Sequence, residues 1–114
     1  MNTTLLTNLK YAGSIAVDSG QAMVGDPCYL DKWEPWADGT SFDHEANAGK
    51  YGYLGACGVT LKEGYGQLGA ADAVVFSTGY GDGIYPVYVK LNDDGRVGMV
   101  VIDFEGELDD DEQD

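Results

Sequence analysis

The chain has 114 residues and a mass of 12.2 kDa, which suits one domain and is too little for two separate hydrophobic cores. Twenty acidic residues against six basic ones give a formal net charge of −14, so the long-range field repels phosphate and argues strongly against direct nucleic-acid binding. Hydrophobic residues make up 44% of the chain, which excludes an intrinsically disordered protein.

The sequence predicts neither a membrane span nor an export signal. No apolar run approaches the roughly 20 residues that a spanning helix needs. The first ten residues, MNTTLLTNLK, lack the basic region and the long apolar stretch of a signal peptide. We therefore expect a soluble cytoplasmic protein.

The acidic residues are concentrated at the C-terminal end. Positions 103–114 hold eight acids and no base. Such a block buries too little apolar surface to order itself, so residues 105–114 are predicted to form a solvated, disordered tail unless a partner holds them. Residues 1–104 are predicted to form a single β-rich domain.

The first predicted elements are a short helix and a hairpin. Residues 3–10 could form two helical turns with their leucines on one side. Residues 13–17 and 21–25 are strand-like and flank Asp18, Ser19 and Gly20, which favours a hairpin with glycine at a position of positive φ.

The middle of the chain gives weaker signals. Residues 31–50 show no clear periodicity and are predicted to be a long loop, which is usually functional. Residues 51–61 (YGYLGACGVTL) are predicted to form a strand in which three glycines mark a bulge or a close backbone approach.

Three further strands are predicted over residues 72–78, 84–91 and 97–104, joined by GYGDG and NDDG turns. Gly83 is expected to need a positive φ, and Pro86 predicts a free edge or a bulge because it lacks a ladder donor. The last strand is apolar on both faces and is predicted to be central. The predicted fold class is all-β, an antiparallel β-sandwich or partly open barrel of about six to eight strands.

Four phrases of the sequence form a specific set: DSGQ, DPCY, GAC and GYGDGxYPVY. Together they resemble a family of small bacterial and bacteriophage proteins of unknown function. The resemblance covers residues 17–104 and carries no settled reaction or ligand. It implies a compact β-rich domain and a phage or bacterial source.

Two cysteines, Cys28 and Cys57, lie inside these phrases. A disulfide is not expected in a cytosolic protein, and a structural zinc site needs four suitably spaced ligands, so no metal or other cofactor is predicted. Packing in the β core is the favoured interpretation of both thiols. The alternative is a thiol site in which His44 activates Cys28 and Asp26 or Asp43 orients the imidazole ring.

Aromatic and acidic residues provide the candidate binding site. Tyr and Trp combine a large apolar body with one polar tip. Packing within strands is the favoured interpretation, and holding a partner is the alternative. The GYGDG loop lacks the Lys and the following helix of a phosphate-binding loop, so its glycines are assigned to turns. The candidate binding residues are Trp33, Trp36, Tyr80, Asp82, Tyr85, Asp109, Asp110 and Asp111.

The sequence therefore predicts a non-catalytic acidic protein that engages a basic protein partner. With a phage source, it would imitate nucleic acid and inhibit a host nuclease, polymerase or defence system. Two alternatives stay open: a binder of a nucleotide-like or aromatic metabolite in a Tyr- and Trp-lined pocket, and a Cys- and His-dependent enzyme.

Overall fold

The computed structural model describes residues 6–35 and 43–108. The chain divides into two compact units, and each is described by itself. Unit 1 comprises residues 1–18 and 82–114, and unit 2 comprises residues 19–81. Unit 2 is thus an insertion between the first strand and the last two strands of unit 1. Within the described ranges, no helix has the length and apolar character needed to cross a membrane.

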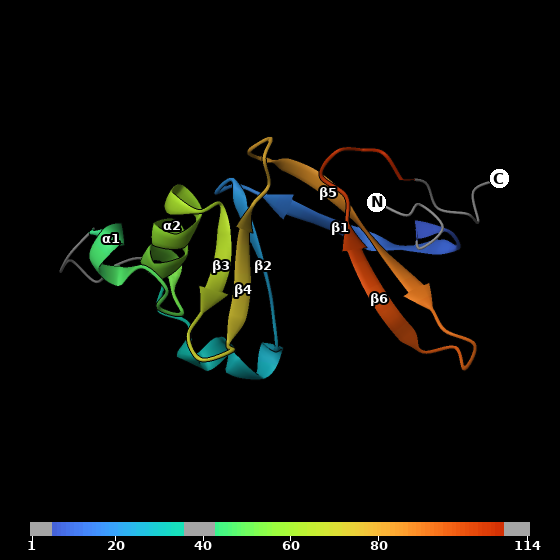
Figure 1. Ribbon diagram of the computed structural model, residues 1–114, viewed down its shortest axis with the longest axis horizontal. Coiled ribbons are helices and arrows are strands. Elements are labelled where there is room, and N and C mark those ends of the chain that lie inside the picture. Colours follow the sequence, from blue (N-terminus) through green and yellow to red (C-terminus); the bar gives the residue numbers. More distant parts are fainter. Residues whose placement is uncertain (1–5, 36–42, 109–114) are drawn as a thin grey trace. The chain divides into compact units, whose positions relative to one another are not determined.

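Unit 1 is a three-stranded antiparallel sheet in the order β1-β5-β6 (Figure 1). Its strands are β1 (Leu9–Val17), β5 (Gly83–Leu91) and β6 (Val97–Ile102). Strand β5 is rich in aromatic and β-branched residues, which favour a pleated and half-buried surface. Its rings Tyr85 and Tyr88 are buried and supply the largest apolar side chains of this unit's core.

The turn between β5 and β6 follows the predicted NDDG hairpin. Gly95 has a φ of +80°, which L side chains adopt only with strain. The Asn92 side chain accepts hydrogen bonds from the backbone N–H groups of Asp94 (2.9 Å) and Arg96 (3.0 Å). The predicted hairpin turn is confirmed. It is predictable because it depends on residues adjacent in the chain: an asparagine amide that bonds the nearby backbone and a glycine in the left-handed conformation.

The predicted central position of the last strand is wrong. β6 is an edge strand and β5 is central, although β5 contains Pro86. The Pro86 carbonyl accepts a hydrogen bond from the Asp103 backbone N–H at 3.2 Å, one residue beyond the last residue of β6. In an antiparallel strand the N–H and C=O of one residue point to the same side. The hydrogen bond that Pro86 cannot donate would therefore lie at the end of the β5–β6 pairing, where its loss costs little stability.

The segment after β6 is tied to β5. The buried carboxylate of Asp103 accepts three backbone hydrogen bonds, from Glu105 (2.9 Å), Gly106 (3.0 Å) and Leu108 (2.8 Å). The Tyr88 hydroxyl donates to the Leu108 carbonyl at 2.9 Å. Hydrogen bonds thus hold residues 105–108 in place within unit 1, with residues 105–107 exposed, whereas residues 109–114 of the predicted tail lie outside the described residues.

Unit 2 is a second three-stranded antiparallel sheet, in the order β2-β4-β3 (Figure 1). Its elements are β2 (Gln21–Gly25), the 3₁₀ helix η2 (Pro27–Lys32), α1 (His44–Asn47), α2 (Tyr53–Lys62), β3 (Tyr65–Leu68) and β4 (Ala73–Ser77). Its buried core consists of Tyr51, Ala56, Leu68, Ala73 and Val75. The two sheets confirm the predicted all-β class of antiparallel strands.

The strand predicted over residues 51–61 is wrong, because this segment forms α2. Its glycines are needed for close packing: a Cβ on Gly55 would lie 1.9 Å from the Lys50 carbonyl oxygen, and one on Gly58 would lie 2.2 Å from that of His44. The two glycines are three positions apart and share a helix face. The predicted close backbone approach is therefore present, but a helix makes it.

Two further N-terminal expectations are corrected. β1 and β2 do not pair as a hairpin, because β1 pairs with β5 in unit 1 and β2 pairs with β4 in unit 2. Gly20 between them nevertheless has the expected positive φ, +71°. The helix expected over residues 3–10 includes Leu9 and Lys10, which already belong to β1, while residues 3–5 lie outside the described residues.

Gly83 does not have the expected positive φ, whereas Gly81 has a φ of +82°. A Cβ on Gly83 would lie 3.4 Å from the Tyr85 ring, an ordinary contact. We therefore expect Gly83→Ala to leave the free energy of unfolding nearly unchanged and Gly81→Ala to lower it by about 1 kcal/mol. Urea denaturation of both variants checks this, and equal losses would contradict the assignment of the strained position to Gly81.

Candidate functional site

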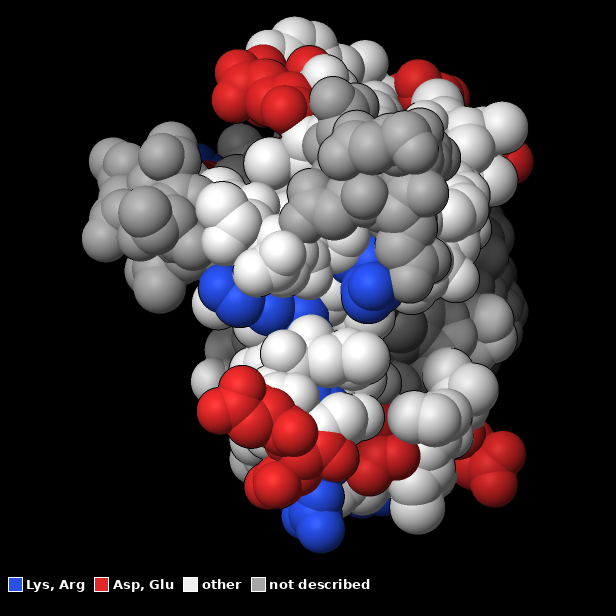
Figure 2. Space-filling view, turned by 90° about the vertical axis from the view of Figure 1, so that its right-hand side faces the viewer, with Lys and Arg blue, Asp and Glu red and all other residues white. Residues whose placement is uncertain are grey.

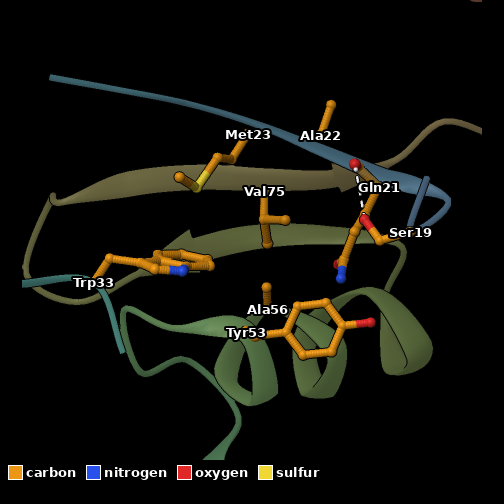
Figure 3. A pocket seen from close by; sticks show the side chains of 8 residues that line it. All are labelled: Ser19, Gln21, Ala22, Met23, Trp33, Tyr53, Ala56 and Val75. Carbon is orange, nitrogen blue, oxygen red and sulfur yellow. Dashed lines mark hydrogen bonds between the residues drawn. The ribbon is translucent and has the colours of Figure 1, made fainter. Parts of the chain in front are cut away.

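Unit 2 contains an open pocket of about 150 Å³ (Figure 3). The residues that line it are Ser19, Gln21, Ala22, Met23, Trp33, Tyr53, Ala56 and Val75. In Figure 3 the Trp33 and Tyr53 rings lie on one side of the hollow and Met23 lies opposite Trp33. The pocket therefore combines aromatic and aliphatic walls with few polar groups, which is typical of ligand pockets.

The pocket arises where α2 does not cover the sheet. α2 packs against β3 and β4, whereas β2 is at the edge of the sheet. Met23 of β2 is paired with Val75 of β4, so both side chains are on the same face and line the hollow. The pocket thus lies over β2 and β4, beside α2.

The apolar wall is held by the core of unit 2. The Trp33 indole makes a T-shaped contact with the buried Tyr51 ring, with centroids 5.2 Å apart and an interplanar angle of 83°. Such a contact fixes the indole plane. Ala56 and Val75 are both almost fully buried and form the floor. The wall is therefore in place before any ligand arrives.

The polar end of the pocket is the Gln21 amide, which α2 holds in one orientation. Gln21 Nε2 donates to Cys57 Sγ at 3.4 Å, and Thr60 Oγ1 donates to Gln21 Oε1 at 3.0 Å. An amide carries two N–H donors and two acceptor lone pairs, so each of these bonds uses half of the amide's capacity on its side. The remaining capacity can orient a polar atom of a ligand.

The Tyr53 hydroxyl lies in the same region of α2. Electrostatic repulsion from the Cys57 side chain, burial of the phenol and the hydrogen bond with Cys57 together raise the pKa of Tyr53 above its usual 10.0. The phenol is therefore neutral at physiological pH and can act as a hydrogen-bond donor or acceptor.

Four of the eight predicted binding residues lie within the described part of the chain. Trp33 lines the pocket and is half-buried. Tyr85 is buried in unit 1, where its ring makes a T-shaped contact with Phe104 at 5.0 Å. Tyr80 and Asp82 are both exposed, at the end of unit 2 and the start of the second segment of unit 1. The other predicted binding residues, Trp36, Asp109, Asp110 and Asp111, lie outside the described residues.

The residues of the predicted thiol site have separate local roles. The Asp26 carboxylate caps η2 by accepting from the Cys28 backbone N–H at 2.8 Å, and Asp43 caps α1 by accepting from the Ala46 N–H. Both thiols are free, with Cys28 exposed and Cys57 half-buried beside Gln21. The catalytic trio stays a prediction.

His44 begins α1, and its Nδ1 atom is buried without a hydrogen-bond partner among the described residues. The described ranges contain no group of three or more His, Cys, Asp or Glu side chains able to hold a metal ion.

Sequence reasoning misses Gln21, Met23 and Tyr53 as pocket residues. A signal for two parts of the site is nevertheless present: the DSGQ phrase contributes Ser19 and Gln21, and the GAC phrase contributes Ala56 and Cys57. Because the sequence predicts a strand at GAC, it does not place these side chains beside β2. The helix brings the two phrases together.

Comparison with known proteins gives one family. The model of a family described as "Protein of unknown function (DUF4241)" matches residues 6–102, which is most of the chain. No curated protein and no solved structure matches.

Proposed function

This chain belongs to the DUF4241 family, whose function is unknown, and from its site we propose a non-catalytic binding protein that engages a basic protein partner through the pocket of unit 2. The observation that carries the proposal is the pocket itself, an aromatic and aliphatic hollow with one oriented amide. A hollow of about 150 Å³ suits one large side chain or a similarly small ring.

The chemistry of the pocket favours a ring or aliphatic side chain. Trp33 and Met23 provide apolar contact area, and an aromatic side chain buried in such a hollow is the usual anchor of a protein interface. The Gln21 amide then distinguishes a ligand that carries a hydroxyl or N–H group from one that does not. Only binding and orientation are required.

The charge of the chain supports a basic partner. The formal net charge is −14, which speeds association with a cationic surface and slows it for an anionic one. On the face drawn in Figure 2, acidic groups gather at the top and at the bottom, and Lys or Arg side chains lie across the middle and beside the lower acidic groups. This mixed surface favours a partner with individual basic residues.

Host nucleic-acid enzymes and defence proteins form one class of partner with suitable cationic surfaces, and a phage inhibitor in the cytoplasm would meet them. The phrases DSGQ and GAC fit such a role as binding motifs, because their residues meet at the pocket. Under this proposal they specify the anchor, while the surplus of acidic residues increases the association rate.

A small-ligand binder is the second candidate, because the same walls would hold an aromatic metabolite or a nucleobase. The two candidates differ in the effect of salt. Association with a basic peptide should weaken as ionic strength rises, whereas insertion of a neutral ring into the pocket should not.

The test uses three probes: p-cresol, Ac-Lys-Tyr-Lys-amide and Ac-Glu-Tyr-Glu-amide. Binding is followed by NMR from the Trp33 indole N–H resonance, in a Trp36→Phe background that leaves one tryptophan signal. We expect the basic peptide to bind about tenfold more tightly than the acidic one at low salt, with the difference shrinking above about 300 mM salt.

Matched tyrosine variants locate the binding. Tyr53→Ala should weaken every probe about fivefold or more by removing one pocket wall, whereas Tyr65→Ala, at an exposed position of β3, should change nothing. Equal affinity of all three probes at every salt concentration would favour the small-ligand candidate. No shift of the Trp33 signal with any probe would overturn the pocket as a binding site.

A further inference from the structure

The pocket lies next to an open sheet edge. β2 is the end strand of its sheet, and among the described residues its second edge pairs with no other strand. It is five residues long, Gln21–Gly25, and contains no proline, lysine or bulge of the kind that blocks pairing at an exposed edge.

The direction of each backbone group in β2 follows from two hydrogen bonds. The Thr78 N–H donates to the Gly20 carbonyl at 3.0 Å, so the Gly20 carbonyl faces β4. Ser77, the partner of Gln21 in the register, donates its N–H to Gly64 on the far side of β4 at 2.7 Å. In an antiparallel pair these directions alternate with each residue.

It follows that the backbone groups of Ala22 and Val24 face β4, whereas those of Gln21 and Met23 face the open edge. The Gln21 carbonyl accepts a long hydrogen bond of 3.4 Å from Ser19 Oγ, drawn in Figure 3. Within the part of the chain that the structure describes, the Gln21 N–H and both backbone groups of Met23 are therefore available for pairing with another strand.

The two residues with outward backbone groups also line the pocket with their side chains. Residues opposite each other in neighbouring strands have their side chains on the same face, with Cβ atoms about 5 Å apart. A residue that paired with Met23 from an added strand would thus direct its side chain to the face that carries the pocket. Backbone pairing and side-chain insertion are compatible in one pose.

The charges beside the pocket fit a basic segment. Asp26 follows β2 directly and is exposed, and the exposed Asp31 and Glu34 lie close to Trp33 in the chain, with one exposed base, Lys32, between them. The surplus of exposed carboxylates in these segments attracts a lysine or arginine of the bound segment.

We infer that unit 2 binds an extended segment of a basic protein as an added β-strand along the open edge of β2, with one aromatic side chain of that segment in the pocket. The inference rests on the proposed function and specifies its mode. Main-chain hydrogen bonds supply affinity, and the pocket selects the residue.

The test uses the peptide Ac-Lys-Thr-Tyr-Thr-Lys-amide and amide hydrogen exchange by NMR. On binding, the exchange of the Gln21 and Met23 N–H groups should slow about tenfold or more, whereas Ala22 and Val24, already paired with β4, should change little. Two N-methylated peptides provide the matched control. One carries N-methyl groups on the first, third and fifth residues of the peptide, and the other carries them on the second and fourth. Only one of them should lose about tenfold or more in affinity.

The outcomes separate the two proposals. If both methylated peptides bind like the parent and shift the Trp33 signal, the pocket is the binding site but the strand mode is wrong. If the parent peptide shifts no pocket signal, the proposed function fails as well. In the protein without peptide, the Gln21 and Met23 N–H groups could instead be protected from exchange to a degree that rises with protein concentration. That result would show that a second copy of the chain occupies the edge, and it would also overturn the inference.

Discussion

Gly58→Ala is expected to lower the free energy of unfolding of unit 2 by about 3 kcal/mol or more. The new Cβ would lie 2.2 Å from the His44 carbonyl oxygen and 2.6 Å from the Ala48 Cβ, and the nearest atoms include backbone that no side-chain rotation can move. Alanine in place of glycine inside a helix would by itself gain about 1 kcal/mol. The steric term is larger, so the net effect should be destabilising.

Urea denaturation followed by Trp33 fluorescence in the Trp36→Phe background measures this loss. Gly98→Ala provides the control, because a Cβ there would have its nearest contact at 3.8 Å and Gly98 has no positive φ. A Gly58→Ala protein as stable as its parent would show that the α1 segment can move away from α2. Close packing of α2 against residues 44–48 would then contribute little to the stability of unit 2.

Asp103→Ala is expected to lower the free energy of unfolding by about 3 kcal/mol. The buried carboxylate accepts hydrogen bonds from the N–H groups of Glu105, Gly106 and Leu108. Removal of the acceptor leaves three backbone donors without their partner. Asp103→Asn should cost less, about 2 kcal/mol, since its single oxygen can replace only one of the two carboxylate oxygens.

The measurement is urea denaturation together with hydrogen exchange of the Leu108 amide, which should become faster in both variants. Asp82→Asn removes the same charge at an exposed position and is the matched control. If Asp82→Asn and Asp103→Asn lose equal stability, the effect comes from net charge. The turn after β6 would then contribute little.

The candidate site is predictable from the sequence only in fragments. Trp33 can be identified because a large aromatic residue in a segment without periodicity indicates binding, and it lines the pocket. Tyr53 cannot, because it looks ordinary in its own segment, and the DSGQ phrase singles out Gln21 without indicating what its side chain contacts. Both side chains contact Cys57. Gln21 does so across 36 residues of chain, and Tyr53 does so within α2.

The sequence by itself determined where β2, β4 and β5 lie and how the chain turns at residues 92–95. These features depend on neighbours in the chain: β-branched and aromatic runs, and glycine or asparagine at the turns. It also determined the all-β class, because enough such runs were present.

Only the tertiary structure decided which strands pair, that residues 53–62 form a helix, and that β2 has an edge unpaired by any described strand. Strand partners depend on contacts between distant segments, which no local pattern encodes. The helix is favoured over a strand because Gly55 and Gly58 allow the chain at residues 44–50 to approach it, and that packing outweighs the poor helix propensity of glycine. The pocket exists because this helix packs mainly against β3 and β4 and contacts β2 through the side chain of Gln21.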